Sequence, residues 1–304
     1  MKVLVTGING FIGAATARAL LASGHQVIGM VRASSCLDRL DEVRQDIQFI
    51  QGDLAAIAEA APAIADVAPE SCIHLAWYAE PGKYPHAVEN LDALRGTSSL
   101  VEVLARAGCS RFIGIGTCFE YDFDRGWLRE DSPIRPATLY AASKACMSTL
   151  LPKLAEKLQM SAAWLRIFYQ YGPQEDRRRL VASVIHAMLA GDEVATTWGE
   201  QVRDFLHVDD VGRAIATAAA SDLEGVVNIG SGVPVTVREI IETIGRKLNR
   251  LELAKFGARP YNPTDPPFIV ANNRLLKEST AWRPKFDLDK GLDDTIAWWK
   301  SKSV

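Results

Sequence analysis

The feature that most constrains this chain is a glycine-spaced turn between its first apolar segment and a run of helix-forming residues. The turn, Gly7-Ile-Asn-Gly10-Phe-Ile-Gly13, follows the β-branched stretch Lys2–Thr6 and precedes the alanine-rich stretch Ala14–Ser23. Glycines at a strand-to-helix turn let backbone N–H groups approach a pyrophosphate at the positive end of the helix. The spacing differs from the G-x-G-x-x-G fingerprint, so a glycine-rich turn without a ligand is the competing interpretation.

Short β-branched segments alternate with alanine- and leucine-rich segments through the first half of the chain, which predicts βαβ units on a parallel sheet. The expected strands are Lys2–Thr6, Gln26–Val31, Ile47–Gln51, Ser71–Leu75, Arg111–Gly116 and Ala162–Phe168. The expected helices are Ala14–Ser23, Ala87–Ala107 and Leu139–Leu158, the last with a kink at Pro152. We predict an α/β fold, with a Rossmann-type doubly wound parallel sheet and a smaller, irregular α/β C-terminal substrate subdomain.

The alternation breaks after Phe168, where Tyr171–Arg179 is typical of an exposed loop and prolines accumulate from Pro260 onwards. A strand-helix-strand piece from Phe205 to Ser231 resumes it. The two parts are therefore expected to interleave. We assign residues 1–169 and about 205–231 to a dinucleotide-binding domain, and about 170–204 and 232–304 to the substrate-binding subdomain.

Composition excludes several classes of protein. With 304 residues, a net charge of -3 and 48% hydrophobic residues, the chain is close to the globular average, and we expect neither a nucleic-acid nor a membrane partner. The five cysteines stand singly, without C-x-x-C pairs or a zinc-like histidine spacing, so a reduced, metal-free protein is expected. Met1 leads directly into the first strand without a secretory h-region, and we expect a cytoplasmic location.

The end of the second expected strand bears on the choice of cofactor. Sites for NAD usually carry an acidic residue there to bond the ribose hydroxyls, whereas this chain has Arg32, followed by Ser34 and Ser35. A guanidinium can pair with a ribose 2'-phosphate, so the sequence favours NADP(H) and leaves NAD(H) possible, with a solvated loop arginine as the alternative. The residues predicted to bind cofactor from their positions after strands are Gly7, Asn9, Gly10, Phe11, Ile12, Gly13, Arg32, Ser34, Ser35, Asp53, Leu54, Leu75, Ala76 and Trp77. His74 fits a contact residue and an interior histidine equally well.

The segment Tyr140-Ala-Ala-Ser-Lys144 opens an expected helix, and residues four apart share one helical face. A buried ammonium beside a phenol is expected to lower the tyrosine pKa toward a range useful for proton transfer. Pairs of this spacing are common by chance, but this one follows the expected dinucleotide fold and lies about two dozen residues after Thr117. We predict Thr117, Tyr140 and Lys144 as the catalytic set, with Tyr140 and Lys144 also contacting the cofactor.

Taken together, these motifs and several others are specific to one family. The chain resembles, over nearly its whole length, the extended short-chain dehydrogenase/reductase family, the group of nucleotide-sugar epimerases, dehydratases and reductases. The residues that carry this resemblance are Gly7 to Gly13, His74-Leu-Ala76, Thr117 with Tyr121, Tyr140 with Lys144, Leu165-Arg166, Tyr171-Gly-Pro173, Arg203-Asp-Phe205, Val208-Asp-Asp210, Asn228-Ile-Gly230 and Trp282-Arg-Pro284.

The resemblance implies roles for individual residues and for the assembly. Tyr140 is then the general acid/base on a sugar hydroxyl or keto oxygen, Lys144 holds the nicotinamide ribose, and Thr117 hydrogen-bonds the reacting oxygen. Arg203 and Arg259 are implied to grip the diphosphate of a nucleotide-sugar substrate. Tyr169 is implied to contact the sugar or phosphate. A homodimer is implied, formed by the helices expected at Ala87–Ala107 and Leu139–Leu158.

Departures from the family pattern bear on the reaction. Cys118 and Phe119 stand where the resembled sugar 4,6-dehydratases have an acidic pair, which argues against dehydration, and Cys118 is expected to be a buried apolar residue. Because of Arg32, we favour an NADPH-dependent 4-keto reductase of a nucleotide-linked 4-keto-6-deoxy sugar, with Tyr140 as proton donor. The alternative is a nucleotide-hexose 4-epimerase with tightly bound NAD. A catalytically silent NADP-binding regulator is disfavoured because the catalytic set is intact.

Overall fold

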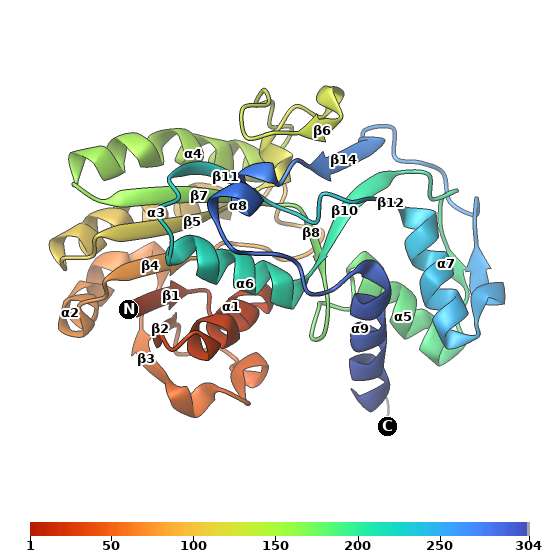
Figure 1. The fold of residues 1–304 in the computed structure, drawn as a ribbon, viewed down its shortest axis with the longest axis horizontal. Helices are drawn as coiled ribbons and strands as arrows, with labels where there is room; N and C mark the ends of the chain where they lie inside the picture. Colours follow the sequence, from red (N-terminus) through yellow and green to blue (C-terminus); the bar gives the residue numbers. More distant parts are fainter. Residues whose placement is uncertain (303–304) are drawn as a thin grey trace.

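A parallel sheet forms the centre of the N-terminal part of the molecule (Figure 1). In the computed structural model, which describes residues 1–302, this sheet has seven strands in the order β11-β7-β5-β4-β1-β2-β3. Every neighbouring pair in it is parallel. The strands are β1 Lys2–Thr6, β2 Gln26–Val31, β3 Ile47–Gln51, β4 Ser71–His74, β5 Arg111–Thr117, β7 Ser161–Ile167 and β11 Gly225–Ile229.

Helices cover both faces of this sheet, which makes it doubly wound. On one face α1 (Phe11–Ala22) packs on α6 (Val208–Ala219), and on the other lie α2 (Ile57–Val67), α3 (Glu89–Arg106) and α4 (Leu139–Lys157). Successive side chains of a strand point to opposite faces, so Val3 and Val5 join the first apolar core and Leu4 joins the second. A strand buried on both faces must be apolar throughout, which is why these strands read as continuous apolar runs.

A smaller sheet forms the second part of the molecule, to the right in Figure 1. Its strands are β8 Tyr169–Tyr171, β10 Val202–His207, β12 Pro234–Thr236, β14 Phe268–Ala271 and β6 Trp127–Leu128, with a separate pair of β9 Val194–Ala195 and β13 Ala254–Lys255. An apolar core lies between this sheet and three helices, α5 Leu180–Ala190, α7 Val237–Leu248 and α9 Leu288–Lys302, while the short α8 Arg274–Ser279 lies beside β11.

The predicted α/β class, with its Rossmann-type doubly wound sheet, is confirmed. Three of the expected strands have the predicted bounds, two differ by one residue at one end, and the strand expected at Ala162–Phe168 lies one residue earlier, at Ser161–Ile167. The helix expected from Ala14 begins at Phe11, because the chain turns into helical geometry directly after Gly10. The helix containing Pro152 runs through that residue as a single element.

The strand-helix-strand piece that starts near Phe205 is divided between the two sheets. Its first strand, β10, pairs with β8, β12 and β14 in the smaller sheet, whereas α6 packs on α1 and β11 forms an edge of the large sheet. The loop expected to be exposed after Tyr171 is partly buried, since Tyr171, Gly172 and Glu175 are all buried. Within residues 1–302, no helix is both long and apolar enough to span a membrane.

Candidate active site

The glycine turn has the geometry that the sequence predicts for an anion site. Gly7 has φ +66°, and a Cβ atom there would lie 2.7 Å from the backbone nitrogen of Ala76. A Cβ atom on Gly13 would overlap the carbonyl oxygen of Gly7. No side chain caps Gly10 and the first turn of α1 carries no acidic residue, so its N–H groups face outward with their positive partial charge. The residues present therefore fit the pyrophosphate of a dinucleotide.

The loop after β2 is tied to this turn. Asn9 donates a hydrogen bond from Nδ2 to the carbonyl oxygen of Cys36 (3.1 Å). Within the loop, the backbone N–H of Arg32 donates to Ser35 Oγ (3.1 Å) and that of Ser35 donates to the Arg32 carbonyl oxygen (3.0 Å). Arg32 and Ser34 are exposed. The structure therefore brings the predicted ribose-side residues to the same edge of the sheet as the glycine turn.

The remaining predicted cofactor residues follow β3 and β4. Asp53 is exposed and accepts a hydrogen bond from the backbone N–H of Ala55 (3.0 Å), which begins a short 3-10 turn, and Leu54 packs against Gly96 of α3. Leu75 and Ala76 line the other side of the glycine turn, where Gly7 approaches their backbone. These contacts place the loops after β1, β3 and β4 along one edge of the sheet, as the parallel order requires.

His74 is an interior residue. Its Nδ1 lies 2.7 Å from Thr6 Oγ1 and its Nε2 lies 2.9 Å from Thr97 Oγ1, so both ring nitrogens have hydroxyl partners. Burial, assisted by the positive charge of Lys144, lowers the pKa of His74 to about 3. The imidazole is therefore neutral and serves to join β1, β4 and α3.

The structure brings the three predicted catalytic residues together at the end of β5 and the start of α4. Thr138 caps α4 by accepting a hydrogen bond from the backbone N–H of Ala141 (3.2 Å), which puts Tyr140 and Lys144 on consecutive turns of one helical face. The Thr117 hydroxyl is near enough to the Tyr140 phenol to lower the pKa of that phenol. The Lys144 Nζ atom lies 6.0 Å from the centre of the Tyr140 ring.

The sequence-based prediction of a lowered pKa for Tyr140 is wrong. Burial raises the pKa of this phenol well above its ordinary value, the nearby Tyr84 adds to the effect, and the hydrogen bond with Thr117 offsets part of it. The ammonium of Lys144 does not reverse this shift, because it donates a hydrogen bond to the Ile115 carbonyl oxygen (2.6 Å) instead. Burial also lowers the pKa of Lys144 to about 7, against an opposing effect of the Glu120 carboxylate.

Two aromatic rings pack against Lys144 and Tyr140, and the sequence predicted only one of them as part of the site. Lys144 Nζ lies 3.7 Å from the centre of the Trp77 ring. The Tyr84 ring meets the Tyr140 ring edge to face at 4.8 Å between centres. Trp77 was predicted as a cofactor residue, but Tyr84 and the supporting Asn90 were missed. Tyr84 lies in the loop after the fourth strand, at the ligand-binding edge, and Asn90 lies in the first turn of α3 directly after that loop, and this position is the signal that points to them.

A buried ion pair holds the backbone of Thr117 in place. Glu120, which is fully buried, accepts hydrogen bonds at Oε1 from the backbone N–H of Thr117 (2.9 Å) and from Trp164 Nε1 (3.0 Å). Its Oε2 pairs with Nε of the buried Arg166 at 2.7 Å. Every oxygen of the carboxylate therefore has a donor, and the end of β5 is held rigidly.

The predicted substrate-binding residues are only partly brought together. Arg203 is buried, pairs with Asp265 at 2.6 Å, and places its guanidinium 5.6 Å from the centre of the Tyr169 ring. Arg259 lies on an exposed loop, where its backbone N–H donates to the Thr196 carbonyl oxygen (3.0 Å). The shared grip of Arg203 and Arg259 on a diphosphate therefore stays a prediction.

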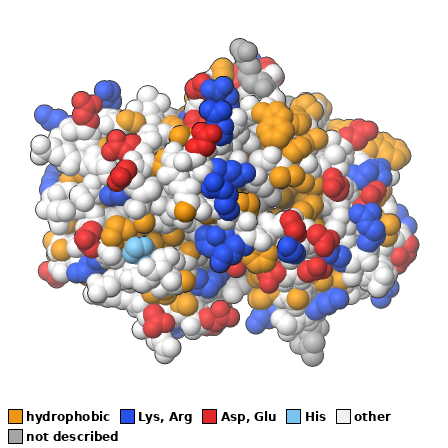
Figure 2. Space-filling view, viewed as in Figure 1, with side chains coloured by type: hydrophobic (Ala, Val, Ile, Leu, Met, Phe, Trp, Pro, Cys, Tyr) orange, Lys and Arg blue, Asp and Glu red, His pale blue; other side chains and the backbone are white. Residues whose placement is uncertain are grey.

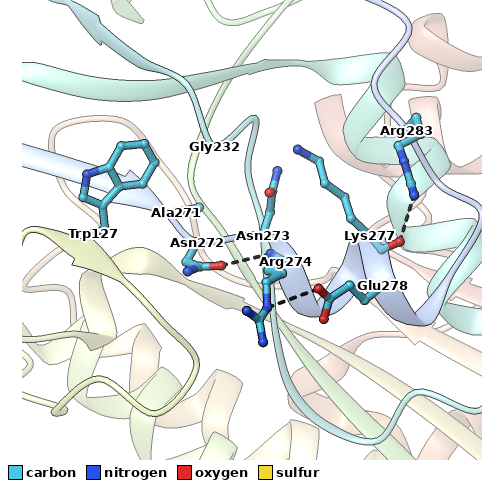
Figure 3. A pocket seen from close by; sticks show the side chains of 9 residues that line it. All are labelled: Trp127, Gly232, Ala271, Asn272, Asn273, Arg274, Lys277, Glu278 and Arg283. Carbon is cyan, nitrogen blue, oxygen red and sulfur yellow. Dashed lines mark hydrogen bonds and ion pairs between the residues drawn. The ribbon is translucent and has the colours of Figure 1, made fainter.

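A separate cavity of about 530 Å³ opens between β6, β14 and α8 (Figure 3). Arg274 pairs there with Glu278 (3.3 Å), and Arg283 donates to the Lys277 carbonyl oxygen (2.9 Å). Figure 2 shows Lys and Arg side chains gathered near the middle of this face, beside an apolar patch. The lining residues are Trp127, Gly232, Ala271, Asn272, Asn273, Arg274, Lys277, Glu278 and Arg283, and they include no member of the catalytic set. We therefore locate the site by the converging side chains rather than by this depression.

Comparison with known proteins agrees with this arrangement. Residues 3–230 match the model of the NAD dependent epimerase/dehydratase family. A dTDP-glucose 4,6-dehydratase of Streptomyces griseus is 28% identical, over 98% of this chain and 93% of the relative. Among solved structures, UDP-glucose 4-epimerase from Thermotoga maritima, determined with UDP-glucose, superposes with a TM-score of 0.90 at 25% identity over 100% of both chains. The Thermus thermophilus UDP-glucose 4-epimerase, in complex with NAD, has a TM-score of 0.85 at 26% identity over 99% of both.

The family match covers most of the large sheet, including the glycine turn, Thr117, Tyr140 and Lys144. The structural matches extend it over the second subdomain. The chain therefore belongs to the NAD-dependent epimerase/dehydratase family and is an enzyme of the extended short-chain dehydrogenase/reductase type.

Proposed function

We propose that this enzyme is a nucleotide-hexose 4-epimerase, which oxidises and re-reduces C4 of a nucleotide-linked hexose. The observation that carries the proposal is the convergence of Thr117, Tyr140 and Lys144 at the sheet edge that also holds the glycine turn. Two of the structural neighbours are UDP-glucose 4-epimerases. The sequence alone favoured the reductase, and this similarity favours the epimerase instead.

In this proposal each residue of the catalytic set has a distinct task. When bound, the nicotinamide ring supplies a hydride acceptor and donor for C4. The Tyr140 phenol exchanges a proton with the C4 oxygen, and the Thr117 hydroxyl, which lies near that phenol, orients the same oxygen. Lys144, with its pKa lowered to about 7, holds a proton that is exchangeable near neutral pH at the base of the site.

The surroundings of Thr117 support this reaction over dehydration. Cys118 is buried in an apolar cluster with Leu128 and Ile269, and burial keeps its thiol protonated by raising its pKa. The Phe119 ring packs against Tyr169 at 6.1 Å between centres. Neither position offers the acid and base that removal of water from a hexose requires.

A specific observation favours a second candidate, an NADPH-dependent 4-keto reductase of a nucleotide-linked 4-keto-6-deoxy sugar. Arg32 and the hydroxyls of Ser34 and Ser35 lie where a ribose 2'-phosphate would be recognised, and net reduction commonly draws on the phosphorylated cofactor. The same Tyr140 would then donate a proton to the C4 oxygen as hydride is delivered.

The nucleotide released when the purified protein is denatured separates the candidates. Stoichiometric NAD, together with interconversion of UDP-glucose and UDP-galactose without added cofactor, supports the epimerase. An empty preparation that consumes NADPH with a 4-keto-6-deoxy nucleotide sugar supports the reductase instead. Tyr140→Phe is the control, since it removes the proton-transfer group and should abolish either turnover. A protein that binds NADPH but converts neither substrate class would overturn both and support the regulator.

A further inference from the structure

The loop between β4 and α3 folds over Lys144 and Tyr140 and contacts both side chains. Trp77, near its start, places its ring 3.7 Å from Lys144 Nζ. Tyr84, near its end, packs edge to face on Tyr140, with 4.8 Å between ring centres. The Pro85 carbonyl oxygen also accepts a hydrogen bond from the backbone N–H of Tyr140 (3.0 Å). The position of this loop therefore bears directly on where the two reactive side chains lie.

One side chain ties the loop together. Asn90, in the first turn of α3, is fully buried. Its Oδ1 accepts a hydrogen bond from Trp77 Nε1 (2.8 Å), and its Nδ2 donates to the carbonyl oxygens of Tyr84 (2.7 Å) and Ala87 (2.8 Å). Both donors of the amide are thus used, and its oxygen holds the indole that covers Lys144.

We propose that Asn90 is a positioning residue that, by fixing this loop, sets where the Lys144 ammonium and the Tyr140 phenol lie. The inference rests on the proposed function, because it takes Tyr140 and Lys144 as the reacting pair. Asn90 itself touches neither of them. It acts through Trp77 on Lys144 and through Tyr84 on Tyr140.

The chemistry of these contacts explains why a single amide has this influence. The indole face attracts the Lys144 ammonium, and it does so strongly because the ammonium is shielded from water. The other titratable groups that face this ammonium are His74 on β4, Glu120 in the 3-10 turn after β5, and Tyr140 on α4 itself. Removing the Asn90 side chain would take the amide donor from the part-buried carbonyl oxygen of Tyr84 and release the indole. A misplacement of the reacting groups by about 1 Å lowers turnover by up to roughly a hundredfold.

A double-mutant cycle between Asn90→Ala and Trp77→Phe tests the inference by turnover. We expect Asn90→Ala to lower kcat by about tenfold or more, with the KM for the nucleotide sugar within about twofold of wild type. Since Trp77→Phe removes a hydrogen bond that Asn90→Ala already breaks, the double variant should be no slower than the slower single variant. Asn272→Ala, which removes an amide whose Oδ1 accepts a hydrogen bond from the backbone N–H of Arg274, is the matched control and should leave kcat unchanged. Additive losses, or a larger KM with unchanged kcat, would overturn the proposal.

Fluorescence gives a readout that does not depend on any substrate. The emission lost on Trp77→Phe isolates Trp77 from the other six of the seven tryptophans. In the Asn90→Ala background this difference emission should shift to longer wavelength and become more accessible to acrylamide. Thermal unfolding of both variants checks that they are folded. An unchanged Trp77 emission overturns the positioning role. If the emission changes but the protein turns over no nucleotide sugar, the effect of Asn90 on Trp77 stands and the proposed function is rejected.

Discussion

The Lys144 ammonium lies 3.7 Å from the centre of the Trp77 indole but 6.0 Å from the centre of the Tyr140 ring, and it donates a hydrogen bond to the Ile115 carbonyl oxygen. This relationship explains why the lysine does not lower the tyrosine pKa, and the pKa of the lysine itself lies at about 7. Several expectations for the site follow from it and from its neighbours.

Stability should depend on pH through Lys144. Its pKa is lowered to about 7 in the folded protein from 10.5, so between these values the unfolded chain binds more protons and folding stability rises with pH. Below about pH 7 both states are protonated and the unfavourable contribution of the buried charge is fully present. From pH 7 to 9 wild type should gain roughly 2 kcal/mol relative to Lys144→Met. Urea unfolding at both pH values measures this, and parallel pH profiles for the two proteins would contradict it.

Breaking the Glu120–Arg166 pair should strongly destabilise the protein. Glu120→Ala leaves the Arg166 guanidinium buried without its carboxylate, which costs about 3–5 kcal/mol. Asp131→Ala is the control, because Arg129 and Asp131 form a solvent-exposed pair whose loss should cost less than about 1 kcal/mol. Chemical denaturation compares the two, and similar midpoints for both variants would show that the buried pair contributes little.

Substitutions in the glycine turn should weaken cofactor binding in a graded manner. Gly13→Ala places a methyl group on the Gly7 carbonyl oxygen and must displace the turn, whereas a Cβ at Gly10 lies 3.2 Å from the same atom. We expect Gly13→Ala to weaken binding of the nicotinamide cofactor by about a hundredfold or more, roughly 3 kcal/mol, and Gly10→Ala to have a smaller effect. Titration calorimetry measures both affinities, and equal effects would argue against a pyrophosphate on this turn.

The charge at residue 32 should decide between the two cofactors. If Arg32 recognises a 2'-phosphate, Arg32→Asp should lower the affinity for NADP(H) by about tenfold or more and raise that for NAD(H), because a carboxylate repels the phosphate and bonds the ribose hydroxyls. Arg44→Asp makes the same change of charge at another exposed arginine and serves as the control. Identical preferences in wild type and Arg32→Asp would assign Arg32 to the solvated loop.

The homodimer stays a prediction, and the structure suggests how to test it. Leu151 and Met147 of α4 are buried against the sheet, whereas Leu150 is 42% exposed and Cys146, one turn earlier on the same side, is also exposed. If α4 forms the interface, Leu150→Glu should convert a dimer to a monomer in light-scattering measurements at micromolar concentration. Lys153→Glu, on the same helix, is a control for added charge, and a monomeric wild type would reject the prediction.

Local pattern in the sequence was enough to predict the large sheet and to single out the candidate catalytic set. Strands such as Lys2–Thr6 are apolar on both faces because helices cover both faces of the sheet. The resulting continuous apolar run is visible in the sequence of the strand itself. The glycine turn is equally local, since Gly7 and Gly13 lie within one strand-to-helix connection. Tyr140 and Lys144 share a helical face at a fixed spacing.

Tertiary structure alone decided the features that depend on burial and on contacts distant in sequence. Arg203 pairs with Asp265, which is 62 residues away in the sequence. Strand β10 pairs within the smaller sheet, although the sequence around it has the strand-helix-strand alternation of a Rossmann-type sheet. The sign of the Tyr140 pKa shift depends on how deeply the phenol is desolvated and on where the ammonium points, which the spacing of two residues does not specify. The Asn90–Trp77 bond likewise forms because the loop between them closes on itself, and only the packed fold determines that closure.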